Sequence, residues 1–271
     1  VEKYLVSDNF IRNSAYRSAY ISANRGTSIL VNEEDHLRIQ CMTAGLNLKA
    51  PLTIAMQIDD AVESRLDLAF DEKMGYLTSC PTNLGTGLRA TVLLHLPGLT
   101  YTRNMHNIIN ISQQIGLSVQ GLYGEGSDAT GNVFAISNQL TLGLSEIDII
   151  DNLAGAVTEI IEHERRARKA LVLYSKDRLE DAIWRAYGIL QYARSLGEDE
   201  VLELISKVRL GVDLGLLHEV ERDRFGEVLI ASRPNYIRNL AGTENLSPSE
   251  LDRRRAEVVR RVLAGDSKER E

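Results

Sequence analysis

Cysteines and long apolar segments are scarce in this sequence. Cys41 and Cys80 are the only cysteines among 271 residues, too few for a disulfide scaffold and too far apart for a zinc site. No apolar run approaches the roughly 18 residues that span a bilayer, and none follows the first residues as in a signal peptide. We therefore expect a protein of the reducing cytoplasm, with no membrane segment and no metal site of its own.

A surplus of basic residues is also missing. The formal net charge of −7 argues against a general affinity for nucleic acid, although a local basic cleft for a nucleotide remains compatible with it. The apolar fraction of 44% and the charged fraction of 25% are ordinary for a soluble globular protein. Because the first residue is Val1 and not Met, we expect the coding sequence to continue upstream.

Periodicity divides the chain into two halves. Strand patterns are expected at residues 28–31, 37–41, 76–78, 90–95, 117–122 and 133–140. Helical periodicity is found at residues 52–68 and at 102–115, where Gly116 ends the pattern. From Ser145 onward helical periodicity dominates, with breaks at Gly197, near Gly211 and at Pro234. We predict a mixed α/β domain over residues 1–155 and an α-helical domain over residues 156–271.

The loop expected at residues 80–89 reads Cys-Pro-Thr-Asn-Leu-Gly-Thr-Gly-Leu-Arg. Proline, asparagine and two glycines permit a tight loop with exposed backbone N–H groups, which can cradle phosphates. Arg89 can add a charge-assisted contact. These residues alone leave the choice between a phosphate loop and a structural turn open.

Two further segments carry carboxylates. Residues 31–38 read Val-Asn-Glu-Glu-Asp-His-Leu-Arg, which taken alone favours a solvated acidic turn. Residues 120–127 read Gln-Gly-Leu-Tyr-Gly-Glu-Gly-Ser, and their glycines suit a loop that closes over a substrate. This second segment contains neither a Walker A motif nor a G-x-S-x-G elbow.

Together the three segments resemble the signature segments of phosphagen kinases, the family of arginine and creatine kinases. The resemblance implies an α+β fold, with an antiparallel-sheet guanidino-kinase domain followed by an α-helical domain, and it implies ATP and Mg²⁺ as cofactors. Glu34, Glu125 and Cys80 would then be catalytic residues beside the guanidinium substrate. ATP would be bound by Arg38, Arg89, Asn83, Gly85, Thr86 and Thr91.

Within this superfamily the chain resembles the bacterial protein-arginine kinases. The resemblance rests on Tyr-Gly-Glu-Gly-Ser at 123–127, on Ile-Ser-Asn-Gln at 136–139 and on the long helical half. It implies that Asp252 and Arg255 bind phosphoarginine. The partners it implies are proteins with exposed arginines, a zinc-binding activator protein and a Clp ATPase, with roles in marking proteins for proteolysis and in controlling heat-shock repressors. A homodimer is among the assemblies it allows.

The chain departs from the family pattern at several positions. No arginine-rich segment precedes the first motif, Gln120 replaces an arginine, and Leu251 replaces the first arginine of the phosphoarginine motif. Because these arginines neutralise phosphate charge, we expect little or no kinase activity from this chain alone. Two alternatives stay open: a kinase for a free guanidino metabolite, and a non-catalytic module that binds phosphoarginine or regulates a kinase.

Charged runs outside these motifs are expected to be solvated helix faces. This expectation covers the basic run at residues 163–169 and the pair Arg253 and Arg254. His36, inside the acidic turn, is expected to be structural.

Overall fold

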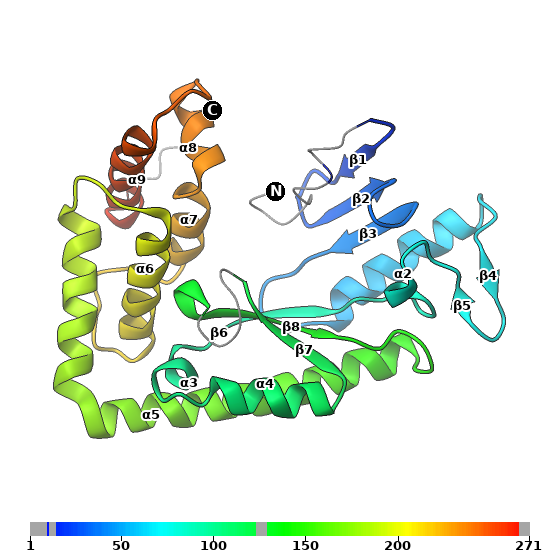
Figure 1. The fold of residues 1–271 in the computed structure, drawn as a ribbon, viewed down its shortest axis with the longest axis horizontal. Coiled ribbons are helices and arrows are strands. Elements are labelled where there is room, and N and C mark those ends of the chain that lie inside the picture. Colours follow the sequence, from blue (N-terminus) through cyan, green and yellow to red (C-terminus); the bar gives the residue numbers. More distant parts are fainter. Residues whose placement is uncertain (1–9, 11–14, 123–128, 266–271) are drawn as a thin grey trace. The chain divides into compact units, whose positions relative to one another are not determined.

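The computed structural model describes residues 10, 15–122 and 129–265 (Figure 1). Strands β1 to β8 are Ser18–Ile21, Thr27–Val31, Leu37–Cys41, Phe70–Asp71, Gly75–Tyr76, Thr91–His95, Leu117–Gly121 and Val133–Asn138. Helices α2 to α9 are Lys49–Glu63, Pro97–Tyr101, Met105–Gln114, Glu146–Tyr192, Glu198–Asp213, Arg224–Ala231, Pro234–Ala241 and Pro248–Leu263. Two short 3₁₀ turns, η1 and η2, are Pro81–Asn83 and Thr130–Asn132. The predicted α+β class, with a helical second half, is confirmed.

The first sheet is an antiparallel meander of order β1-β2-β3. Along β2 the side chains of Ser28 and Leu30 are fully buried while their neighbours are only partly covered, which is the period of two that a half-buried strand shows. Helix α2 lies beside β3 (Figure 1). The strands predicted at residues 28–31 and 37–41 are therefore confirmed, and the second one places Cys41 at the end of β3.

Helix α2 begins three residues before its predicted start at Leu52. Lys49, Ala50 and Pro51 form its first turn, where proline is tolerated because the N–H group it lacks has no partner within a helix. Helix α4 stops at Gln114, and Gly116 follows with a φ of 76°. Gly116 is therefore the stop that the sequence predicts, since glycine adopts positive φ without strain.

The third sheet has the order β6-β8-β7, so the two strands predicted around the glycine-containing loop are neighbours. Near the end of β8 the N–H of Asn138 donates to the carbonyl of Ala90 at 3.4 Å, and the N–H of Gln139 donates to Gly116 at 3.0 Å. The first bond fixes the chain just after the loop that starts at Cys80, and the second fixes it just before β7.

The chain forms two compact units that are interleaved in sequence. One comprises residues 1–92, 110–119 and 136–159, and the other comprises residues 93–109, 120–135 and 160–271. Helix α5 runs through residue 155, and its helical geometry is interrupted at Ser175, with φ −145° and ψ 27°. The domain boundary at residue 155 stays a prediction.

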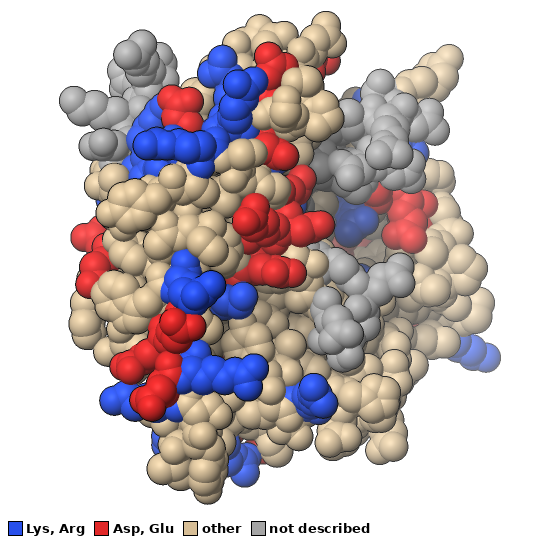
Figure 2. Space-filling view, turned by 60° about the vertical axis from the view of Figure 1, so that its left-hand side comes forward, with Lys and Arg blue, Asp and Glu red and all other residues tan. Residues whose placement is uncertain are grey.

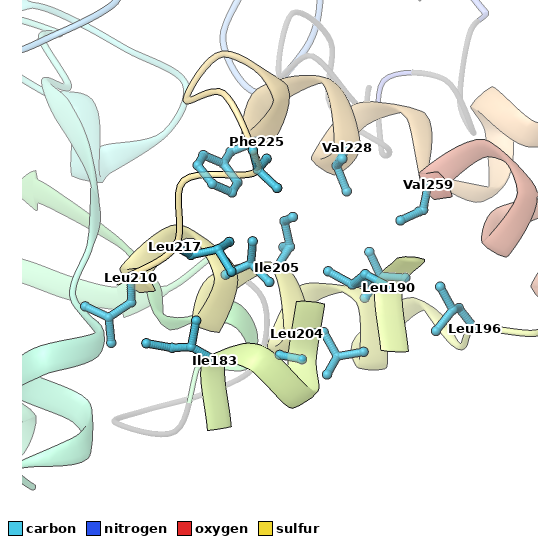
Figure 3. Packing of buried hydrophobic residues seen from close by; sticks show 14 of the residues in the cluster. Ile183, Leu190, Leu196, Leu204, Ile205, Leu210, Leu217, Phe225, Val228 and Val259 are labelled. Atoms are coloured by element: carbon cyan, nitrogen blue, oxygen red, sulfur yellow. The ribbon is translucent and has the colours of Figure 1, made fainter. Parts of the chain in front are cut away.

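The second unit contains a cluster of buried apolar side chains contributed by α5, α6, α7 and α9 (Figure 3). Ile183, Leu190, Val208 and Leu210 within it are fully buried. Gly211 lies inside α6 and does not end the helix. Glycine is required there by close packing, because a Cβ at this position would lie 2.4 Å from Cγ2 of Ile183. None of the described helices is both long and apolar enough to cross a membrane.

The basic run at residues 163–169 is only partly the solvated face that we predicted. Arg165, Arg166 and Lys169 are exposed, and charges of both signs are interspersed on the face shown in Figure 2. Glu164, however, is 5% exposed and accepts hydrogen bonds from the N–H groups of Gly98 and Leu99, both at 2.8 Å. Arg168 pairs with Glu164 at 2.5 Å and with Asp213 at 3.0 Å. The prediction was wrong for Glu164 and Arg168, because a buried carboxylate at the start of α3 needs a cation.

Candidate active site

The acidic motif forms the connection between β2 and β3. The strands are in register with Val31 opposite Leu37, so residues 32–36 make the turn. Asn32 has a φ of 57°, and its N–H donates to the carbonyl of His36 at 2.9 Å. Asparagine tolerates this left-handed conformation better than most residues do. The turn is therefore well defined, and His36 contributes to it through its backbone.

The two glutamates of this turn differ in their surroundings. Oε2 of Glu33 accepts the N–H of Glu34 at 2.9 Å and pairs with Nη1 of Arg38 at 3.0 Å. The Glu33 side chain is 6% exposed. Glu34 is exposed, and its carboxylate has no hydrogen bond or ion pair within the described part of the chain. Glu33 therefore holds the turn together, and Glu34 presents an unengaged carboxylate.

Asp35 joins the acidic turn to the loop that begins at Cys80. Its Oδ1 accepts the N–H of Cys80 at 3.0 Å, and its Oδ2 accepts the side-chain amide of Asn83 at 2.7 Å. Both carboxylate oxygens are thus used on residues more than 40 positions away in sequence. This clamp joins the turn that carries Glu34 to the loop of Cys80, through a residue that the sequence analysis did not select.

The thiol of Cys80 lies in a polar environment. Its Sγ is 3.0 Å from Oγ1 of Thr82, and its carbonyl accepts the hydroxyl of Thr78 at 2.7 Å. Cys41, in contrast, lies on β3, where burial raises the pKa of its thiol although a contact with Thr27 opposes the shift. The two cysteines therefore differ in environment, and the more polar one belongs to the predicted site.

The rest of the loop is fastened to residue 141. Gly85 has a φ of 109°, and a Cβ there would lie 2.3 Å from the carbonyl oxygen of Thr141. Thr86 donates its N–H to the same oxygen at 2.9 Å. The hydroxyl of Thr141 is close to the carbonyls of Leu84, at 2.7 Å, and Thr82, at 3.1 Å. Only glycine fits at position 85, because any side chain would collide with backbone.

Arg89 and Thr91 follow the loop into β6. Asn138 holds the backbone here, with its Oδ1 2.7 Å from the N–H of Ala90 and its Nδ2 2.9 Å from the carbonyl of Leu88. The side chain of Arg89 between them is exposed. Oγ1 of Thr91 is 2.8 Å from Oγ of Ser137. The arrangement fixes the backbone of Arg89 and leaves its guanidinium in solvent, where it can meet an anion.

The loop predicted to close over the substrate contains the second predicted carboxylate, Glu125, and begins at Gln120. Glu125 lies outside the described residues, so its predicted role stays a prediction. Gln120 is exposed near the end of β7.

The predicted phosphoarginine pair lies on α9. Arg255 is 3% exposed, and it donates to the carbonyls of Ser232 and Leu196, both at 2.8 Å, and to Asp252 at 2.5 Å. Leu251 is buried on the same helix. Through these bonds Arg255 connects α9 to the residue that follows α7, Ser232, and to the segment between α5 and α6, which contains Leu196. The ligand-binding role of Asp252 and Arg255 stays a prediction, and the structural role of Arg255 was missed.

The residues of the first unit suit a nucleotide phosphate. Arg89 offers an unpaired cation, judged on the described residues, and the loop of Gly85 and Thr86 lies directly before it. Arg38 is 41% exposed but shares its charge with Glu33. An anion would therefore meet Arg89 first, and Arg38 only in competition with Glu33.

Comparison with known families decides the assignment. Residues 1–167 match the family described as ATP:guanido phosphotransferase, C-terminal catalytic domain. The chain belongs to this family. Residues 176–271 match a second family, described as the protein-arginine kinase McsB C-terminal domain. Residues 168–175 separate the two matches, and Ser175, where α5 leaves helical geometry, is the last of them.

Curated relatives cover nearly the whole of this phosphotransferase chain. The protein-arginine kinase of Halalkalibacterium halodurans is 48% identical over 97% of this chain and 74% of its own length. The protein-arginine kinase of Geobacillus stearothermophilus is 47% identical over 97% of this chain and 72% of its own length. At this identity and coverage the chain belongs with the protein-arginine kinases, and it is an enzyme of the kinase class.

Solved structures of the phosphotransferase family share its fold. A duplicated taurocyamine kinase of Schistosoma mansoni with bound transition-state-analogue components matches 65% of this chain, and 25% of its own, with a TM-score of 0.52 and 27% identity. A lombricine kinase matches 60% of this chain and 48% of its own, also with a TM-score of 0.52 and 27% identity. The predicted guanidino-kinase fold is thereby confirmed.

Proposed function

We propose that this chain transfers the γ-phosphoryl group of ATP to arginine side chains of proteins. The observation that carries the proposal is the Asp35 clamp, which joins the turn of Glu34 to the loop of Cys80. Family membership supports the reaction class, and the relatives named protein-arginine kinase support protein arginine as the acceptor.

The chemistry of the acceptor explains why an unengaged carboxylate is needed. A guanidinium is cationic and delocalised, so it is a poor nucleophile. Glu34 orients the attacking nitrogen and accepts its proton while the N–P bond forms and the bond between the γ-phosphorus and the β,γ-bridging oxygen breaks. Glu125 is proposed as the second carboxylate, which fixes the plane of the guanidinium. Cys80 lies beside this group and helps to place it.

The nucleotide is proposed to lie along the loop of residues 83–89. Arg89 binds phosphate oxygens through its exposed guanidinium. Arg38 adds a second contact when its ion pair with Glu33 is replaced by one with phosphate. Asn83, Gly85, Thr86 and Thr91 line the approach. Mg²⁺ bound with ATP neutralises the remaining phosphate charge. The part played by the protein is therefore alignment and charge neutralisation.

The cellular role that we propose rests on resemblance alone. Arginine phosphorylation by this chain would mark proteins for a Clp protease and act on heat-shock repressors in the stress response of the bacterial cytoplasm. A zinc-binding activator protein, a Clp ATPase and a second copy of the chain are the proposed partners.

Acid-labile phosphate on arginine is the direct test of the proposed reaction. The chain is incubated with Mg-ATP and an unfolded protein, and phosphoarginine is measured by mass spectrometry without acid treatment. Any longer product of the same reading frame is assayed in parallel. We expect phosphoarginine on the protein substrate.

Competing acceptors separate the proposal from its rivals. Turnover of free arginine or taurocyamine without protein phosphorylation would favour a metabolite kinase. Binding of a phosphoarginine peptide without turnover by either product would favour the non-catalytic module. Gln120→Arg should increase turnover, because it returns a cation to the position where the family pattern has one.

A further inference from the structure

A small cavity lies in the second unit, and none of its lining residues has been assigned a role above. It is lined by side chains from the end of β6, from η2 and from α6 and α7, among them His95, Gly131, Ser206, Arg209, Phe225 and Leu229. The space open to the centre of a water molecule is about 10 Å³, close to the ~10–15 Å³ that a single water requires. The cavity therefore admits one atom-sized polar group and not a whole metabolite.

His95, which lines this cavity, has one buried ring nitrogen without a partner among the described residues. Its Nε2 is 2.8 Å from Oγ of Ser206, which also accepts the side-chain amide of Asn132 at 2.8 Å. Its Nδ1 is buried and has no hydrogen-bond partner among the described residues. Because Asn132 already donates to Ser206, the serine hydroxyl can donate to Nε2, and the ring proton then lies on Nδ1. In this tautomer the buried Nδ1 is an N–H donor without an acceptor.

Arg209 adds a second donor at the same wall. Its guanidinium makes no hydrogen bond or ion pair within the described chain. The nearest acid that acts on its charge is Asp213, which pairs instead with Arg168 at 3.0 Å and with Arg222 at 3.6 Å. None of the residues that line the cavity is a carboxylate. The site thus combines the N–H of His95 and the cationic guanidinium of Arg209 with apolar walls.

The electrostatics give this site a single positive charge. Burial, with the nearby Arg209 and Arg168, holds the pKa of His95 well below its usual value, so the ring is neutral at pH 7. Burial also lowers the pKa of Arg209, but a guanidinium stays protonated at that pH. A partly buried cation without a counterion is costly, and a monovalent anion would offset that cost.

We propose that this cavity binds a small anion between Nδ1 of His95 and the guanidinium of Arg209. A halide fits the available space, and so does one oxygen of a larger oxyanion such as phosphate. The bound anion would link the end of β6, which carries His95, to α6, which carries Arg209. The inference does not depend on the proposed kinase reaction.

Thermal unfolding of the whole chain tests the site. The Tm is measured as sodium bromide replaces sodium gluconate at constant ionic strength, and again with phosphate. We expect a rise of roughly 3–6 °C when bromide reaches ten times its Kd, and a further logarithmic increase above that concentration. Phosphate can also bind at Arg38 and Arg89. The phosphate effect that belongs to this cavity is therefore the part of the Tm rise that Arg209→Gln removes. A Tm rise with bromide alone identifies a halide site, and a rise with phosphate that Arg209→Gln removes identifies an oxyanion site.

Two pairs of variants make the result specific. Arg209→Gln should abolish the bromide effect, while Arg185→Gln, which removes an exposed arginine of α5, should retain it. His95→Asn keeps a side-chain amide near the place of Nδ1 and should retain part of the effect. His95→Gln keeps one near the place of Nε2 and should lose the effect.

Diffraction from crystals of the unmodified chain grown in bromide provides a check that does not depend on how the variants fold. We expect an anomalous peak between His95 and Arg209. A water molecule there without an anomalous peak, or a bromide effect unchanged in Arg209→Gln, overturns the proposal.

Discussion

The two compact units of this chain are stabilised in different ways. In the first unit β1 is exposed along its whole length and α2 has no buried residue, so its fully buried apolar side chains, such as Leu30 and Leu153, come from other elements. The second unit contains an apolar cluster around Ile183 and Val208. The predicted site in the first unit is held instead by side chains that bond to backbone, chiefly Asp35, Asn138 and Thr141. Site geometry therefore depends on a few polar contacts, and the stability of the helical unit depends on packing.

The arginines of the two units show the same contrast. Arg38 and Arg89 of the first unit reach solvent, while Arg168 and Arg255 of the second are turned inward onto carboxylates and backbone carbonyls. A buried arginine with satisfied donors stabilises a fold, and an exposed one remains available to an anion. The following experiments test this division of roles, from the largest expected effect to the smallest.

Removing the charge of Glu34 should have the largest effect on activity. Glu34→Gln keeps the shape of the side chain but cannot accept the proton of the guanidinium, so we expect turnover to fall by about 10²–10⁴-fold. Because Glu34 is exposed and unpaired in the described chain, the Tm should not change. Phosphoarginine formation and thermal unfolding are measured together, with Glu72→Gln, on an exposed turn, as the matched control. Parallel loss of activity and Tm would instead indicate a structural role.

Removing the side chain of Arg255 should have the largest effect on stability. Arg255→Ala leaves the carbonyls of Ser232 and Leu196 without donors, and we expect a loss of about 2–5 kcal/mol in the free energy of unfolding. Arg254→Ala, one position away and exposed, should change it by less than about 0.5 kcal/mol. Urea unfolding measures both. A folded, stable Arg255→Ala that has lost phosphoarginine-peptide binding would show that ligand binding is the main role.

Breaking the clamp should affect the site more than the fold. Asp35→Asn leaves one acceptor oxygen in place of two, so one of the two hydrogen bonds is lost and the other loses its charge. We therefore expect kcat/KM to fall by about 10–100-fold, which corresponds to roughly 1.5–3 kcal/mol. The exposed Asp67→Asn is the matched control and should leave the kinetics unchanged.

The exchange of both partners tests the clamp itself. In Asp35→Asn combined with Asn83→Asp, one amide and one carboxylate again face each other, and the bond to Cys80 N–H is retained. We expect part of the lost activity to return. A double variant no better than Asp35→Asn would mean that Asp35 acts by its charge and not as a clamp.

The sequence predicted the site where motifs are continuous and missed the contacts that are distant in sequence. The acidic turn and the loop of Cys80 are each contiguous, so their residues could be identified directly. The bonds of Asp35 join positions 45 and 48 residues apart, and those of Thr141 join positions 57 and 59 apart. No local pattern reports such a contact, which explains why Asp35, Asn138 and Thr141 were not selected for these roles.

The helical period of α9 and α5 contains information on which charged side chains face inward, and the sequence prediction did not draw on it. Arg255 lies four residues after Leu251 and four before Val259, on the stripe of α9 that is buried. Its neighbours Arg253 and Arg254 are exposed, as predicted. Glu164 and Arg168 are likewise four residues apart, on the inward side of α5. The period of the helix could therefore have separated inward arginines from outward ones, even though their partners could not be foreseen.

The smallest effect concerns the two thiols, which report on the two kinds of environment within one unit. Burial raises the pKa of Cys41, so its reactive thiolate is scarce at neutral pH, whereas Cys80 lies on the polar loop beside Thr82. We expect iodoacetamide to label Cys80 a few-fold to about tenfold faster at pH 7.5. The labelling rate of Cys41 should keep increasing with pH above the ordinary pKa of a thiol, because its raised pKa means that the thiolate forms only at higher pH. Peptide mass spectrometry, with Cys41→Ser and Cys80→Ser to assign the signals, measures both rates.

ATP together with an arginine peptide should protect Cys80 from labelling and leave the labelling of Cys41 unchanged. Faster reaction of Cys41, or equal protection of both thiols, would mean that Cys80 does not line the substrate site.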